Sequence, residues 1–144
     1  MTIQIINGPN LNLLGKREPG IYGTETFESF FQKLAGEFPD HNLQYYQSNV
    51  EGEIINKLQE VGFTADGVVL NAGAYTHTSV AIHDALGSIQ APVVEVHISN
   101  VYAREEYRHK SLITSKCIGL LTGFGLEGYR MAIRFLIDRK NQVQ

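Results

Sequence analysis

Five short apolar segments recur along the chain, and each ends at residues that favour turns. β-Branched and aliphatic side chains dominate them, at lengths typical of strands buried in a sheet. The segment Gly67–Asn71 is apolar almost throughout, which is typical of a strand covered on both faces. We therefore predict strands at Ile3–Asn7, Leu43–Gln47, Gly67–Asn71, Val93–Ile98 and Cys117–Thr122.

Segments with helical periodicity lie between these strands. From Phe27 to Phe38, apolar residues recur three or four positions apart, which predicts an amphipathic helix with Thr24 as its N-cap. Similar patterns predict helices at Ile54–Val61, Ser79–Ile89 and Leu126–Arg139, and a short polar helix at Ala103–Lys110.

Strands that alternate with helices predict parallel βαβ units with right-handed crossovers. A chain of 144 residues with 43% hydrophobic content can bury a core of its own, so we expect residues 1–144 to form a single domain. The predicted fold is an α/β three-layer sandwich of the flavodoxin-like type, with a five-stranded parallel sheet in the order 2-1-3-4-5. Such sheets bind ligands beyond the carboxyl ends of their strands, here between strands 1 and 3.

Polar side chains follow the three central strands of this predicted sheet. Asn7 and Asn10 come at and after the end of the first strand, Asn71 ends the third, and His97 and Ser99 come at the end of the fourth. We expect these side chains to share one crevice.

Glu95 and His97 interrupt the apolar fourth strand at a spacing of two, which places both on one face of the pleat. A buried carboxylate beside an imidazole can fix its tautomer and aim its other nitrogen at a ligand, as a general acid requires. A purely structural ion pair would show the same pattern.

Residues 7–23 contain four glycines and two prolines, and their apolar residues follow neither the helical nor the strand period. This pattern predicts a functional loop, with a mobile lid at about 8–24. Within it, Arg17 near Tyr22 would stabilise a phenolate and make Tyr22 a base strong enough for a carbon acid. Both residues could equally belong to an ordinary exposed loop.

The net charge of −3 and the isoelectric point near 5.9 argue against non-specific binding of nucleic acid. The basic residues Arg104, Arg108, His109 and Lys110 cluster locally instead, which suits a small anion.

One cysteine, Cys117, cannot form an internal disulfide and fits a buried strand in a reducing compartment. Without a signal-peptide pattern or an apolar run of membrane-spanning length, we expect a cytoplasmic protein that does not enter membranes.

Two other motifs are weaker. The sequence GFGLEG at 123–128 matches a dinucleotide-binding fingerprint, but the further strand with an acidic residue about 20 positions on is missing, so close packing of a helix on the sheet explains it better. His77, His83, His97 and Glu95 lack the tight spacing of metal ligands. We expect neither a metal nor another cofactor.

The sequence resembles the type II 3-dehydroquinate dehydratases over nearly its whole length. The resemblance rests on four segments: NGPNLNLLGKREPGIYG at 7–23, NAGAYTHTSVAIHDA at 71–85, EVHISNVYAREEYRHKS at 95–111 and GFGLEGY at 123–129. It implies an anti elimination of water from 3-dehydroquinate, through an enolate, to give 3-dehydroshikimate in the shikimate and quinate pathways.

The resemblance also implies roles for single residues. Tyr22 would remove the C2 proton, and Arg17 on the lid would lower its pKa. Asn10 would help to place a water molecule at the enolate oxygen. His97 would donate a proton to the departing C1 hydroxyl, with Glu95 orienting it.

For substrate binding, the resemblance places the carboxylate on Asn71 and on the backbone amides of Ile98 and Ser99, and ring hydroxyls on His77 and Arg108. It puts Arg104 near the lid. It puts Asp84 at a trimer interface, reaching toward the active site of a neighbour in a dodecamer built as a tetramer of trimers.

Two other classes of protein remain as alternatives. A flavodoxin-like receiver or nucleotide-binding module would use the same crevice, but a receiver needs acidic residues where this chain has Asn7, Asn10 and Asn71. A Schiff-base lyase needs a lysine in an apolar pocket. The lysines of this chain fall in the loop, on helices, in polar runs or just before a strand.

Overall fold

The computed structural model describes residues 1–16, 20 and 24–143. It contains a parallel five-stranded sheet in the order β2-β1-β3-β4-β5, which confirms the predicted topology. The strands are β1 (Thr2–Asn7), β2 (Asn42–Gln47), β3 (Gly67–Asn71), β4 (Val93–His97) and β5 (Gly119–Thr122).

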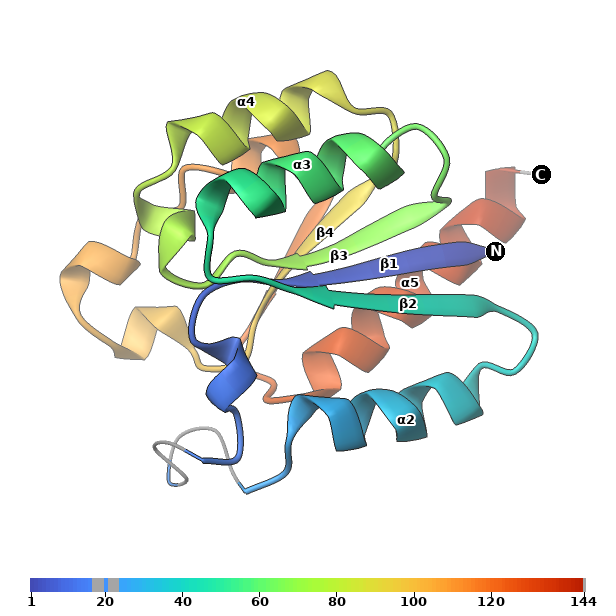
Figure 1. The fold of residues 1–144 in the computed structure, drawn as a ribbon, viewed down its shortest axis with the longest axis horizontal. Coiled ribbons are helices and arrows are strands. Elements are labelled where there is room, and N and C mark those ends of the chain that lie inside the picture. Colours follow the sequence, from blue (N-terminus) through green and yellow to red (C-terminus); the bar gives the residue numbers. More distant parts are fainter. Residues whose placement is uncertain (17–19, 21–23, 144) are drawn as a thin grey trace.

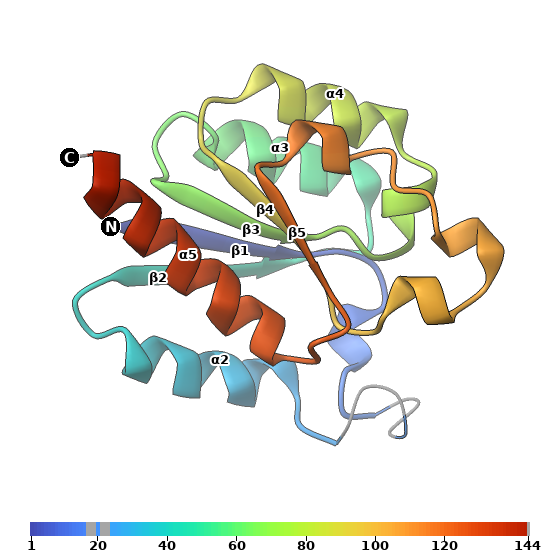
Figure 2. The same ribbon diagram turned by 180° about the vertical axis from the view of Figure 1, so that it is seen from behind.

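Helices cover both faces of the sheet and make three layers (Figure 1). One face carries α3 (Glu51–Val61) and α4 (Val80–Ser88). The other carries α2 (Phe27–Glu37) and α5 (Glu127–Val143), as the view from behind shows (Figure 2).

The two apolar cores follow from the alternation of side chains along the strands. Ile3 and Ile5 of β1 pack toward α2 and α5, whereas Ile6 packs toward α3 and α4. All three are fully buried, because β1 lies between two strands and between two helical layers. The sheet is therefore a rigid support for the residues at its edge.

Helix α2 begins at Phe27, two residues later than an N-cap at Thr24 would place its first residue. Thr26 is the N-cap, and its hydroxyl oxygen accepts a hydrogen bond from the backbone N–H of Ser29 at 3.2 Å. The prediction of Thr24 as the cap was wrong, because the sequence offers two threonines and only the backbone conformation selects between them.

The predicted polar helix at 103–110 was also wrong. Two 3-10 turns, Val101–Ala103 and Glu106–Arg108, replace it, and the backbone is extended at Arg104 and Glu105 between them. The segment has no apolar stripe that packing could use to stabilise a continuous helix.

Cys117 lies just before β5 rather than within it. The 3-10 turn Thr114–Lys116 comes first, and the strand begins at Gly119. The thiol is only partly exposed, and burial together with the charge of Glu95 raises its pKa to about 12.

No helix within the described residues is long and apolar enough to cross a bilayer.

Candidate active site

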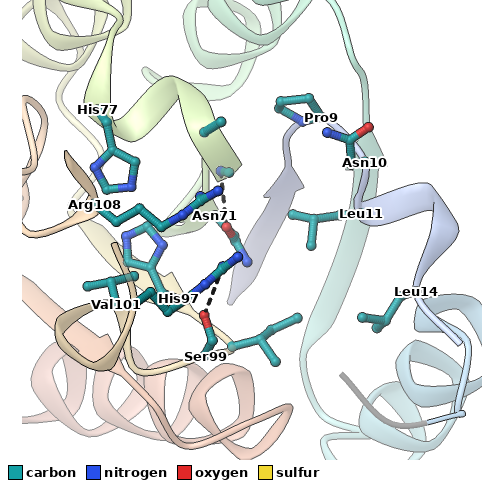
Figure 3. Close-up of a pocket in the computed structure, with 14 residues that line it drawn as sticks. Pro9, Asn10, Leu11, Leu14, Asn71, His77, His97, Ser99, Val101 and Arg108 are labelled. Carbon is teal, nitrogen blue, oxygen red and sulfur yellow. Dashed lines mark hydrogen bonds between the residues drawn. The ribbon is translucent and has the colours of Figure 1, made fainter. Parts of the chain in front are cut away.

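A pocket opens at the edge of the sheet where β1, β3 and β4 end (Figure 3). The turn after β1 supplies Pro9 and Asn10, β3 supplies Asn71, and β4 supplies His97. These strands end at the same edge because they are parallel, and the order of the sheet reverses between β1 and β3. The pocket therefore lies where the predicted crevice was expected.

His97 and Glu95 form a buried pair beside this pocket. Nε2 of His97 lies 2.5 Å from Oε2 of Glu95, and the residues are 7% and 0% exposed. Because Nε2 is engaged by the carboxylate, Nδ1 is the ring nitrogen that can serve a ligand. His97 lines the pocket, whereas Glu95 lies behind it.

Two hydroxyl groups complete the surroundings of Glu95. Ser111 Oγ donates to Oε2 at 3.2 Å, and Thr114 Oγ1 donates to Oε1. Burial works to raise the pKa of Glu95, but the hydrogen bonds from His97, Thr114 and Ser111 outweigh it and hold this pKa below its ordinary value. Glu95 is therefore an ionised carboxylate inside the protein.

Asn71 is held by partners on both ends of its amide. Its Oδ1 accepts from the backbone N–H of Gly73 at 3.1 Å, and its Nδ2 donates to the hydroxyl of Tyr129 at 2.9 Å. The Tyr129 hydroxyl donates in turn to Oδ1 of Asn7 at 2.8 Å. This chain of bonds fixes Asn71 with a second N–H available to the pocket.

Asn10 has a left-handed backbone, with φ 72°. It is the one non-glycine residue with positive φ in the part of the chain that the structure describes. Its backbone N–H donates to Oδ1 of Asn49 at 3.0 Å, and Gln47 Nε2 donates to the same oxygen at 3.1 Å. Asn and Gly tolerate this conformation best, so the turn suits the residue found there.

Two rings stack at one side of the pocket. The His77 and His97 rings are 6.3 Å apart at an angle of 20°, and His77 Nδ1 lies 2.7 Å from the carbonyl oxygen of Lys110. Because Nδ1 of His77 is engaged, its Nε2 is the nitrogen available to a ligand.

Two arginines complete the same side. Arg108 is anchored through Nε to Glu105 at 2.7 Å, and Nη1 of Arg104 lies 3.4 Å from Ser99 Oγ. The described residues that line the pocket include both arginines and both histidines, and no carboxylate is among them. The site is therefore suited to an anionic ligand with hydrogen-bonding groups.

The dehydroquinase class II family model matches residues 1–137 of this chain. The chain belongs to the class II dehydroquinase family. A 3-dehydroquinate dehydratase from Prochlorococcus marinus is 49% identical, with the match covering 99% of this chain and 100% of the relative. The crystal structure of a type II dehydroquinase from Butyrivibrio crossotus has a TM-score of 0.91 at 50% identity, covering 94% of this chain and 97% of the other. That of the Propionibacterium acnes type II dehydroquinase has a TM-score of 0.88 at 38% identity, covering 94% of each chain.

Most of the site residues expected from the sequence lie together in the pocket. Those that line it are Asn10, Asn71, His77, His97, Ile98, Ser99, Arg104 and Arg108. Asp84 does not: it lies on α4 with a side chain that is 71% exposed, and pairs with the neighbouring His83. Arg17 and Tyr22 lie outside the described residues, as does most of the second half of the expected lid at 8–24.

Asn7 departs from expectation. It was expected in the crevice, but it is fully buried and supports Asn71 through Tyr129. It is the last residue of β1, and its side chain lies within the core instead of beyond the end of the strand. Within the described part of the chain, no three His, Cys, Asp or Glu side chains gather as a candidate metal site.

Sequence reasoning missed Tyr129, Ser111 and Thr114. The signal for the two hydroxyl residues was indirect: a carboxylate inside an apolar strand needs hydrogen-bond donors from elsewhere in the chain. Tyr129 had a similar signal, because a tyrosine on the buried face of a helix needs a partner for its hydroxyl.

Proposed function

We propose that this chain is a 3-dehydroquinate dehydratase that converts 3-dehydroquinate to 3-dehydroshikimate in the shikimate or quinate pathway. Membership of the class II dehydroquinase family and the names of relatives at about half identity support the assignment. The observation that carries it is the buried Glu95–His97 pair at a pocket free of carboxylates among its described lining residues. Such a pocket offers a proton donor beside an anion site.

The substrate carboxylate binds at Asn71 and at the backbone amides of Ile98 and Ser99. Support comes from the fixed orientation of the Asn71 amide, which turns an N–H toward the pocket. Ring hydroxyls are held by His77 and Arg108, each of which is itself anchored. Arg104 adds positive charge near the entrance and lies next to Ser99.

His97 acts as the general acid. A protonated imidazole delivers its proton from Nδ1 to the departing C1 hydroxyl, which leaves as water. Glu95 binds Nε2 and stabilises the positive charge, and it keeps its own charge throughout because it is strongly hydrogen-bonded. The carboxylate therefore orients the acid and does not itself exchange a proton.

The base that removes the C2 proton is Tyr22, with Arg17 lowering its pKa. The described lining of the pocket contains no tyrosine and no carboxylate, so the histidines are its only basic side chains of moderate strength. Burial raises the pKa of Tyr45 to about 12 and raises that of Tyr129, which keeps both protonated. Both pocket histidines already have other proposed roles, His97 as the acid and His77 at a ring hydroxyl, so we assign the base to the 7–23 loop.

The enolate formed by loss of the C2 proton requires a partner for its oxygen. Asn10 places a water molecule there, and its position on the pocket wall opposite His97 supports this role (Figure 3). The elimination is anti, with the base and the acid on opposite faces of the ring.

The chain assembles as a trimer, and four trimers form a dodecamer. Asp84 is available for such a contact, because its side chain on α4 is largely exposed. Val80 on the same helix is 62% exposed, which leaves apolar surface for a contact.

The single cysteine supports a cytoplasmic location.

An ultraviolet assay tests the proposed reaction, because the product is a conjugated enone and the substrate is not. Purified protein should generate the enone from 3-dehydroquinate and leave quinate and shikimate unchanged. A His97→Ala variant provides the matched control for contaminating activity. Failure of the purified protein to form the enone would remove the proposal.

A further inference from the structure

We propose that the hydroxyl groups of Ser111 and Thr114 form a clamp that holds Glu95 as an ionised carboxylate against His97, and that both are positioning residues for the general acid. The inference rests on the proposed function for its catalytic consequence. Its structural part concerns only Glu95.

The clamp surrounds the carboxylate with donors. Thr114 Oγ1 donates to Oε1, Ser111 Oγ lies 3.4 Å from Oε1 and 3.2 Å from Oε2, and His97 Nε2 lies 2.5 Å from Oε2. Glu95 is fully buried, so water cannot replace a lost donor without local rearrangement. An unpaired buried carboxylate would take up a proton instead of bearing the cost of its charge.

The local fold directs the Ser111 hydroxyl hydrogen at Glu95. The backbone N–H groups of Ile113 and Thr114 donate to Ser111 Oγ at 3.2 and 3.1 Å. These two bonds occupy the lone pairs of the oxygen, so its own hydrogen is free to point at the carboxylate. The same turn carries Thr114 into contact with Oε1.

The segment that holds the clamp is fastened to the pocket wall. The N–H of Leu112 donates to the carbonyl oxygen of Thr76 at 2.8 Å, and the carbonyl oxygen of Lys110 lies 2.7 Å from His77 Nδ1. The clamp is thus tied to the neighbouring histidine that stacks on His97. Glu95 and both histidines share one support.

Among the described residues, two titratable groups interact with the charge of Glu95. His97 lies on the same strand, and Cys117 lies just before β5, where burial and the Glu95 charge keep its thiol protonated. The positive charge of the acid form of His97 is therefore balanced by Glu95. If Glu95 were protonated, it would lose this charge and its best acceptor for Nε2, and the imidazolium would be destabilised.

Thr114→Val tests the clamp, since it keeps the shape of the side chain and removes the hydroxyl. The loss of a hydrogen bond to a charged group changes an equilibrium or rate constant by a factor of roughly 10 to 100. We therefore expect kcat to fall at least about tenfold while KM stays within about threefold. Thr114→Ser should restore kcat. Ser115→Ala, a change at the exposed neighbouring position, should leave it at the wild-type value.

The second readout is the titration of Glu95, followed by NMR in protein labelled with ¹³C at the glutamate carboxyl carbons. The Glu95 signal is assigned by its loss in Glu95→Gln. Thr114→Val and Ser111→Ala should each raise its midpoint by about one pH unit. A folding defect in one variant leaves the other as the test.

The outcomes separate the clamp from the proposed reaction. An unchanged Glu95 midpoint in the folded variants overturns the clamp, even if kcat falls, because the hydroxyls would then only stabilise the turn. A raised midpoint with wild-type kcat overturns the positioning role. Wild-type protein that forms no enone removes the proposed function, while the titration still decides whether the clamp exists.

Discussion

The hydroxyl of Tyr129 lies 2.9 Å from Nδ2 of Asn71, directly behind the pocket. Tyr129 comes from α5, 58 positions along the chain, and is fully buried. It also donates to Asn7, so the phenol accepts one bond and donates the other. A helix on one face of the sheet thereby fixes which atoms of Asn71 face the pocket.

Tyr129→Phe should weaken substrate binding more than it slows the reaction. The ring keeps its edge contact with Phe27, whose centroid is 4.9 Å away, while Asn71 and Asn7 lose a partner. We expect KM to rise several-fold with kcat within about threefold, and the free energy of unfolding to fall by about 1–3 kcal/mol. Steady-state kinetics and urea unfolding measure the two effects. A large loss of kcat at unchanged KM would show that Tyr129 does not act through carboxylate binding.

His97→Ala should remove most of kcat and leave KM within a few-fold. General acid catalysis contributes roughly 10²–10⁴-fold to a rate. The groups proposed to bind the substrate carboxylate are unchanged in this variant. The measurement is kcat and KM on 3-dehydroquinate, with circular dichroism as the check on folding. If KM rose as much as kcat was expected to fall, with kcat itself preserved, His97 would belong to binding instead.

Arg17 and Tyr22 should act as one unit. Tyr22→Phe should be nearly inactive but folded, and Arg17→Ala should move the acidic limb of the kcat/KM profile to higher pH, because the charge that favours the phenolate is gone. Adding Arg17→Ala to Tyr22→Phe should cost little more. Arg17→Lys should recover part of the loss, since an ammonium keeps the charge without the planar fork. Fully additive losses would show that the arginine does not activate the tyrosine.

Asp66 should contribute stability that disappears in acid. The side-chain bond from Lys140 and then the Thr2 backbone N–H, 2.7 Å from Oδ2, lower the pKa of Asp66 below 3.8, and the side chain is 26% exposed. A lowered pKa stabilises the fold above the ordinary value and loses that effect as pH falls through the folded value. Asp66→Asn should therefore be less stable than wild type at pH 7 by about 0.5–1 kcal/mol, with the difference shrinking below about pH 4. Urea unfolding at several pH values measures it, and a difference independent of pH would exclude the charge as its cause.

The pattern of apolar residues was sufficient to predict the sheet and the Glu95–His97 pair on β4. The strand Gly67–Asn71 was predictable because its composition suits burial on both faces, and the Glu95–His97 contact because side chains two apart share a face of a strand. The predicted helix at 103–110 failed because a polar segment has no periodic signal, and its shape depends on neighbours elsewhere in the chain.

The residues behind the pocket were not predictable for a related reason. Thr114 donates a hydrogen bond to Glu95, which lies 19 positions earlier in the sequence. Tyr129 donates one to Asn7, which lies 122 positions earlier. Such contacts depend on how a turn and a helix pack against the sheet, which no local pattern encodes. The need for donors around Glu95 could be inferred from the sequence, but their identity could not.

The central claim is that this chain removes water from 3-dehydroquinate by anti elimination. It is tested most directly with two samples of 3-dehydroquinate, each carrying deuterium at one of the two positions on C2. NMR of the 3-dehydroshikimate should show deuterium lost from the position anti to the C1 hydroxyl and retained from the other. Loss of the syn deuterium, or absence of the product, would contradict the account.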